Sequence, residues 1–181
     1  GNRAHSYLLD KTYDVVIDNQ SISYGAVKIQ DSFPLVEMMH HPISKDYYYD
    51  LKFAKGILQR ISKIRWYSFL KMQKISAKKI NVVVTPSVNS KADIHIDFKV
   101  PMENIQVIPN GIDCDIFCPL PHIPSKKHRL ITTASADVPL KGLDFSLEAI
   151  ARLKPEYPDI HLMVIGSPRK EGHTERLLKK L

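Results

Sequence analysis

Lys141 and Gly142 form the feature of this sequence that is best suited to binding an anion. They open a predicted helix, residues 143–153, whose first turn carries free backbone N–H groups and the positive end of the helix dipole. A lysine is unfavourable at this place unless an anion lies beside it, and a glycine lets a ligand approach the backbone closely. The pattern is typical of a diphosphate site. A surface lysine without a ligand is the alternative.

Two adjacent histidines, His40 and His41, are a second candidate for chemistry. They follow an apolar segment, residues 34–39, that we expect to form a strand, and they precede Pro42. An imidazole titrates near neutral pH, so a histidine at the end of a strand could donate to a phosphate or a sugar hydroxyl. A purely structural histidine is the alternative.

The sequence does not favour a metal site. Cys114 and Cys118 lie four positions apart, but zinc needs two further ligands, and only His122 and His128 offer themselves nearby. We therefore expect two reduced thiols and no metal. The sequence also contains no Walker loop, no Gly-x-Gly-x-x-Gly, no His-Glu-x-x-His and no Gly-x-Ser-x-Gly motif.

Short apolar segments alternate with helical patterns along the whole chain. This alternation predicts an α/β protein with doubly wound parallel sheets and right-handed crossovers. The expected strands are residues 13–17, 34–39, 81–85, 105–108, 129–133 and 160–166. The apolar run at 13–17 predicts a strand that is buried on both faces. The expected helices are residues 25–29, 48–77, 88–98, 143–153 and 174–181.

Each expected strand turns polar at its carboxyl end. In open parallel sheets, ligands bind in the crevice beyond these ends. The polar residues there are Asp18, Asn19, Gln20, His40, His41, Thr85, Ser87, Asn89, Asn110, Ser135, Asp137 and Ser167. With two sheets, the natural site is the cleft between them. Loop residues are polar in most proteins, so this pattern needs support from other features.

Residues 107–142 contain five prolines, which prevent a long helix or a central strand from crossing this segment. A structureless loop of this length is uncommon inside a compact domain. We therefore expect two units, residues 1–109 and 127–181, joined by a linker at 110–126. A long loop within one domain is the alternative.

The chain is basic, with a formal net charge of +7 and a pI near 9.3. The excess lies between residues 52 and 79, and it could serve nucleic acid, an acidic membrane surface or anionic substrates. The helical pattern of residues 48–77, which Gly56 could break, carries an apolar stripe between the cations. We prefer a core-packed helix with a solvated basic face to a helix that lies on a bilayer.

The sequence shows neither an apolar run of about 18 residues nor a signal-peptide pattern. We therefore expect a cytoplasmic protein, with peripheral membrane contact through the basic helix 52–79 left open.

An ordered set of segments resembles family 4 glycosyltransferases, which are retaining enzymes of the GT-B fold. Residues 107–113, with Phe117 and Pro119, resemble the signature between the two domains of these enzymes. Other segments resemble the donor domain at residues 141–144, 147–150 and 158–166, and the second half of the acceptor domain at residues 40–43, 65–70 and 84–87. The matches cover almost the whole chain in the right order.

This resemblance implies two Rossmann-like domains that face each other across a cleft. The enzyme would transfer a hexose from a UDP- or GDP-sugar to a glycan, lipid or small-molecule acceptor, with retention at the anomeric carbon. The nucleotide-sugar is a substrate, and no cofactor or metal is implied. Neutralising the departing diphosphate is an electrostatic task that a lysine, a helix N-terminus and a histidine can perform.

The resemblance also assigns roles to individual residues. His40 matches a histidine near the donor sugar and is the candidate catalytic residue, while Lys141 matches the lysine that binds the donor diphosphate. The other implied residues are Gly142 and Ser135 at the diphosphate, Asn19, Gln20 and Tyr24 on the acceptor side, and Asn110 and Gly111 at the hinge.

Three departures from the family pattern are visible. Ser135 stands where the family usually has an arginine, six positions before the lysine. The Glu-x7-Glu motif that holds the donor ribose and sugar would lie beyond Leu181, and the Gly-rich loop of the first strand would lie before residue 1. We therefore expect the central part of an enzyme, with both Rossmann-like units incomplete and no transfer by the chain alone.

Two rival functions stay open. A non-catalytic relative that binds a sugar nucleotide or regulates a partner would fit the loss of the arginine at Ser135. A nucleic-acid-binding protein would fit the basic segment, but that segment follows a helical pattern and resembles no nucleic-acid module.

Overall fold

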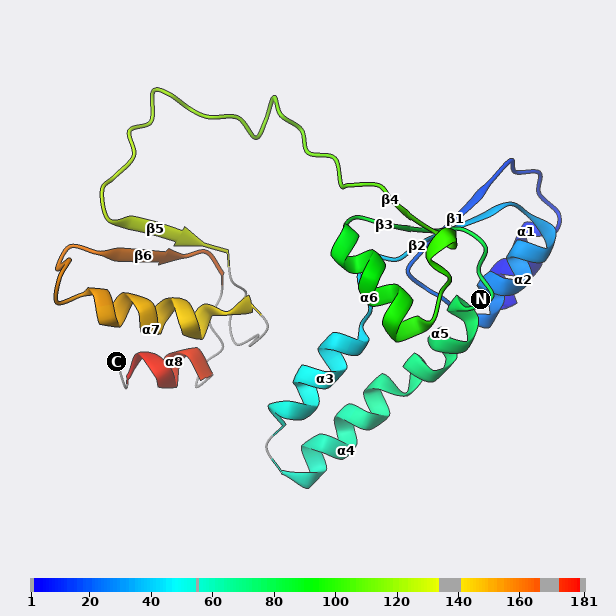
Figure 1. The fold of residues 1–181 in the computed structure, drawn as a ribbon, viewed down its shortest axis with the longest axis horizontal. Helices are drawn as coiled ribbons and strands as arrows, with labels where there is room; N and C mark the ends of the chain where they lie inside the picture. The colour runs from blue at the N-terminus through cyan, green and yellow to red at the C-terminus, as the bar shows by residue number, and fades with distance from the viewer. Residues whose placement is uncertain (1, 55, 134–140, 167–172, 180–181) are drawn as a thin grey trace. The chain divides into compact units, whose positions relative to one another are not determined.

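The computed structural model of the chain describes residues 2–54, 56–133, 141–166 and 173–179. The chain divides into two compact units, Gly1–Asp113 and Cys114–Leu181 (Figure 1). Each unit is described by itself.

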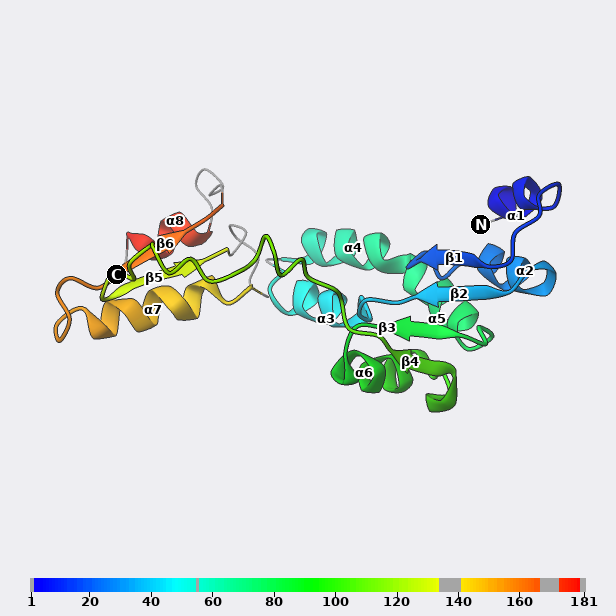
Figure 2. The same ribbon diagram turned by 90° about the horizontal axis from the view of Figure 1, so that it is seen from above.

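A four-stranded parallel sheet forms the centre of the first unit (Figure 2). Its strands are β1 (Val16–Asn19), β2 (Leu35–Met38), β3 (Val83–Thr85) and β4 (Ile105–Val107), in the order β1-β2-β3-β4. Every neighbouring pair is parallel. Parallel strands place all their carboxyl ends at one edge of the sheet, so this edge is where loop residues from different strands can meet.

The helices of the first unit are α1 (Asn2–Leu8), α2 (Tyr24–Ser32), α3 (Ser44–Lys52), α4 (Ile57–Trp66), α5 (Leu70–Ala77) and α6 (Val88–Phe98), with 3-10 turns at Tyr67–Phe69 and Met102–Asn104. The buried core joins one face of the sheet to α2, α5 and α6, as Met39, Ala26, Leu70 and Phe98 illustrate. Burial of this apolar surface is the main stabilising term of the unit.

Local sequence signals explain where several helices begin and end. The Ser87 hydroxyl accepts a hydrogen bond from the backbone N–H of Ser90 at 3.0 Å, so Ser87 is the N-cap of α6. Lys99 ends the helix in the left-handed region, with φ of 59°. Gly56, with φ of 85°, separates α3 from α4 and confirms the expected break at this residue.

Two expectations about burial were wrong. The preference for a core-packed helix over residues 48–77 holds for α5, which has four buried residues, but not for α3 or α4, which have none. The first strand is not buried on both faces, since Ile17 is 67% exposed. β1 is an edge strand of the sheet, and only its Val16 face packs against the core.

The second unit contains a two-stranded parallel sheet, β5 (Arg129–Thr132) and β6 (His161–Val164). Helix α7 (Leu143–Leu153) contacts β6 and α8 (His173–Leu178). At the start of the sheet, His128 Nδ1 lies 2.7 Å from the Asp159 carboxylate. Both units therefore have the expected α/β organisation with parallel strands. None of the helices in the described residues is long and apolar enough to cross a membrane.

Phe98→Ala is expected to destabilise the first unit by about 3–5 kcal/mol, because the ring is 1% exposed and its loss leaves a cavity in the core. Phe53→Ala in the same unit is the matched control. Its ring is 52% exposed, so the expected change is within about 0.5 kcal/mol. Urea denaturation followed by circular dichroism measures both values. Equal losses for the two variants would contradict the assigned core.

Candidate active site

The candidate site lies where β1 and β2 end side by side. Their register pairs Asn19, the last residue of β1, with Met38, the last residue of β2. The chain then continues from β1 into Gln20 and from β2 into Met39 and His40. Residues that are about twenty positions apart in sequence are thereby brought into contact at the carboxyl edge of the sheet.

His40 is held by two side chains from the end of β1. Its ring Nε2 lies 2.9 Å from Asn19 Oδ1, and its backbone N–H donates to Gln20 Oε1 at 3.1 Å. Because an amide oxygen can only accept, Nε2 must carry the proton in this contact. The other ring nitrogen, Nδ1, then accepts a hydrogen bond when the ring is neutral and donates one when it is protonated.

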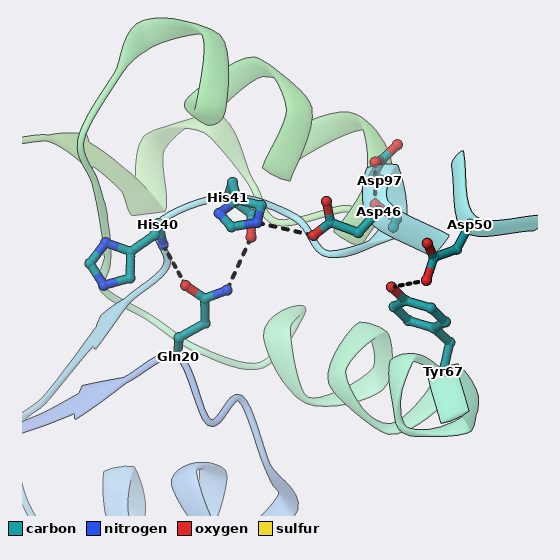
Figure 3. Close-up of polar contacts among 8 residues, drawn as sticks. Gln20, His40, His41, Asp46, Asp50, Tyr67 and Asp97 are labelled. Atoms are coloured by element: carbon teal, nitrogen blue, oxygen red, sulfur yellow. Dashed lines mark hydrogen bonds and ion pairs between the residues drawn. The ribbon is translucent and has the colours of Figure 1, made fainter. Parts of the chain in front are cut away.

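Gln20 links both histidines, as Figure 3 shows. Its side-chain oxygen accepts from the His40 backbone, and its Nε2 donates to the His41 carbonyl oxygen at 3.3 Å. The structure thus brings together three of the predicted site residues: Asn19, Gln20 and His40. This arrangement orients His40 through its ring and its backbone at once.

His41 has a different role from its neighbour. Its ring Nε2 lies 3.2 Å from Asp46 in the first turn of α3 (Figure 3). Ser44 in the same turn donates to Asp97 of α6. These contacts connect the loop after β2 to two helices. The two histidines therefore have different roles. His40 lies at the candidate site, and His41 connects the loop after β2 to α3.

The segment at the end of β1, residues 18–22, has an unusual backbone. Gln20 and Ile22 have positive φ values of 63° and 45°, although neither is glycine. This conformation is costly for a β-branched residue such as Ile22 and persists only when surrounding contacts hold it. Ser21 donates to the Asp18 carboxylate, and Gln73 of α5 donates to the Ser21 carbonyl oxygen at 3.5 Å. We call residues 18–22 the β1 turn.

Glu37 in β2 is the residue of this region that the sequence reasoning missed. Its side chain is fully buried, and neither carboxylate oxygen has a partner at hydrogen-bond geometry. Its pKa is raised from 4.5 to about 8, first by burial and then by the neighbouring Asp18, against the opposing effect of the backbone N–H groups of Ile22 and Gln20. The available signal was an acidic residue inside an otherwise apolar strand.

The other predicted site residues lie at separate places. Tyr24 is the first residue of α2 and is half exposed, and Asn110 and Gly111 are exposed beyond β4. In the second unit, Lys141 is exposed and precedes Gly142, the N-cap of α7, whose φ of 68° favours glycine. Ser135 lies outside the described residues.

The geometry of each unit supports a limited range of chemistry. In the first unit, an oriented imidazole at the edge of a parallel sheet can donate a hydrogen bond to a sugar hydroxyl or a phosphate oxygen. In the second unit, Lys141 and the backbone N–H groups at the start of α7 can bind an anion. The described residues contain no cluster of three or more His, Cys, Asp or Glu side chains that could hold a metal ion.

Comparisons with known proteins give a consistent result. Residues 2–116 match the family model described as Glycosyltransferase Family 4. The MMP alpha-(1->4)-mannosyltransferase of Mycolicibacterium hassiacum is 39% identical to this chain over 170 residues, which are 93% of the chain and 40% of the relative. The chain therefore spans about two fifths of the length of that relative.

Glu37→Gln is expected to flatten the dependence of stability on pH between about 4.5 and about 8. In this range the unfolded chain has lost the Glu37 proton and the folded chain keeps it. The free energy of unfolding of the wild type therefore falls as pH rises, by about 1.4 kcal/mol per unit from this group. Glutamine cannot ionise, so the variant lacks this slope.

Urea denaturation at half-unit steps of pH measures this effect. Glu103→Gln is the control, because Glu103 is exposed and should leave the slope unchanged. If the Glu37→Gln and wild-type curves run parallel, Glu37 does not titrate in the assigned range.

Proposed function

Since the chain belongs to glycosyltransferase family 4, we propose that it forms part of an enzyme that transfers a hexose from a nucleotide-diphosphate sugar to an acceptor with retention of the anomeric configuration. The relative from Mycolicibacterium hassiacum is named as a mannosyltransferase, which favours mannose as the hexose and a glycan as the acceptor. The donor is a UDP- or GDP-sugar, and it takes part as a substrate.

The observation that carries this proposal is the contact of Asn19 and Gln20 with His40 at the carboxyl edge of the first sheet. A sugar ring presents hydroxyl groups, and its donor presents phosphate oxygens. His40 Nδ1 can form a hydrogen bond with either group, because the contact with Asn19 uses the other ring nitrogen, Nε2. In this proposal His40 is the catalytic residue, and Asn19, Gln20 and Tyr24 lie on the acceptor side.

Lys141 and Gly142 supply the second half of the proposed chemistry. Breaking the bond between the sugar and the diphosphate develops negative charge on the leaving group. A lysine beside the first N–H groups of α7 stabilises that charge without a metal ion. Ser135 is proposed to lie at the same diphosphate, in place of a second cation.

The chain alone is proposed to be inactive. It spans 40% of its mannosyltransferase relative, and the Glu-x7-Glu motif that the family resemblance implies for the donor ribose and sugar would lie beyond Leu181. Transfer is therefore expected only from a longer protein that includes this chain. A relative that binds a sugar nucleotide without transferring the sugar is the rival proposal.

A second proposal concerns the hairpin formed by α3 and α4. The two helices are joined by an ion pair of 2.7 Å between Lys63 and Asp50, and Tyr67 donates to the same carboxylate. Neither helix has a buried residue, and Ile57, Leu58 and Trp66 are each more than 70% exposed. Exposed apolar side chains among lysines and arginines fit an anionic membrane surface, so we propose peripheral contact there. We propose no binding of nucleic acid.

Lys141→Ala in the full-length protein is expected to lower kcat/KM for the preferred donor by about 100-fold, or roughly 2.7 kcal/mol of transition-state stabilisation. The measurement is donor turnover with a panel of UDP- and GDP-sugars. Lys126→Ala, also an exposed lysine of the second unit, is the control and should keep its activity. If a donor binds but is never turned over, the sugar-nucleotide-binding rival replaces the transferase. If Lys141→Ala retains full turnover, the diphosphate role is wrong.

Trp66, the only tryptophan of the chain, reports directly on the proposed membrane contact. Its emission should shift to shorter wavelength with vesicles that contain anionic lipid and should stay unchanged with neutral vesicles. A Leu58→Asn variant should lose this shift. Ile96→Asn alters an equally apolar residue of α6 that is 59% exposed, and should keep the shift. An unchanged emission maximum in anionic vesicles would rule out the contact.

A further inference from the structure

We propose that Glu37 is a positioning residue for His40, and that it acts through the β1 turn against which both residues lie. The inference takes the catalytic role of His40 from the proposed function. The assignment of Glu37 itself rests on strand register, burial and the contacts of residues 18–22.

Strand register places Glu37 directly beside the start of the β1 turn. Glu37 pairs with Asp18 on one side and with Val83 of β3 on the other. Paired residues of parallel strands project from the same face, so the Glu37 and Asp18 carboxyl groups lie next to each other. The next residues of the turn, Asn19 and Gln20, hold the ring and the backbone of His40. Glu37 is therefore connected to His40 in two steps: Glu37 lies beside Asp18, and the residues that follow Asp18 contact His40.

The β1 turn needs support because its backbone is strained. Gln20 and Ile22 both have positive φ, and the buried Ile22 side chain and the Gln73 contact to Ser21 hold the turn from the core side. Asp18 accepts from Ser21, which closes the turn on itself. A neutral Glu37 leaves this set of contacts undisturbed.

Ionised Glu37 would act on the turn in two ways. Its charge would repel Asp18, the acceptor that Ser21 uses. It would also draw the backbone N–H groups of Gln20 and Ile22 closer, because these two groups favour the charged form of the carboxyl. Both effects would move Asn19 and Gln20, the residues that contact His40. The reason is that a buried carboxylate without hydrogen-bond partners is energetically unfavourable, so the surrounding residues rearrange around it.

The residues around Glu37 are mostly uncharged. Asp18 is the charged side chain that acts on it among the described residues. The neighbouring strand presents the apolar Val83, and α5 meets the turn through the uncharged Gln73. Helix α2 buries Ala26 and Ile29 on the core side. No nearby cation in this part of the described chain is available to stabilise the ionised form, which agrees with a pKa of about 8.

Histidine NMR on the present chain tests the positioning without any need for activity. The His40 ring signals, assigned by their loss in His40→Gln, should change a second time with a midpoint near pH 8. The 13C signal of the Glu37 side-chain carboxyl should follow the same midpoint. Glu37→Gln should abolish the second change at His40, and Glu103→Gln should preserve it.

Two results would overturn the proposal. One is a His40 ring that shows no second change while the Glu37 carboxyl titrates, since the two groups would then be uncoupled. The other is a Glu37→Gln protein whose His40 signals keep the wild-type profile. If Glu37→Gln does not fold, the midpoints of the His40 ring signals and of the Glu37 carboxyl signal can still be compared in isotope-labelled wild-type protein. Different midpoints would contradict the proposal.

The full-length protein provides the functional measurement. Its kcat/KM should fall about tenfold per unit of pH above roughly pH 8, and this limb should be absent in Glu37→Gln. A purely structural Glu37 would alter stability in the variant but leave the alkaline limb in place, which would contradict the proposal. Coupled NMR signals in a protein that transfers no sugar would instead reject the proposed function and retain the positioning of His40 by Glu37.

Discussion

The parallel pairing of β1 with β2 is the constraint on which the site of the first unit depends. This register sets Asn19 opposite Met38, and the residues that follow each strand therefore meet at one edge of the sheet. A shift of one residue would turn Glu37 away from the core and would separate Asn19 from His40. The hydrophobic effect that buries Leu35, Met39 and Val83 is thus also what fixes the position of the imidazole.

The same edge of the sheet contains departures from the usual rules of stability. A carboxyl group is buried without hydrogen bonds, and two residues other than glycine have positive φ in the turn beside it. Natural proteins concentrate such departures at functional sites, where the surrounding structure compensates for them. Here Gln73 of α5 and the buried Ile22 supply that support. The strained segment therefore lies beside the candidate chemistry at one edge of the sheet.

Much of this structure could be predicted from sequence, and the exceptions have a physical explanation. The bounds of α6 and α7 are those expected, because strong periodicity and end signals such as Ser87 act locally. The pattern of polar strand ends placed Asn19, Gln20 and His40 at one edge of the sheet, but their mutual contacts were not predicted, since they depend on strand register. Glu37 was missed because its burial is set by neighbouring elements. The exposure of α4 was missed because an apolar stripe does not reveal whether a partner covers it.

We propose that this chain contributes a histidine site and a diphosphate-binding lysine to a retaining glycosyltransferase. The most direct test is the anomeric configuration of the product, measured by NMR after the full-length protein has used an α-linked nucleotide-sugar. The account predicts an α-linked product. A β-linked product would contradict retention, and the absence of transfer from every UDP- and GDP-sugar by the folded protein would contradict the transferase itself.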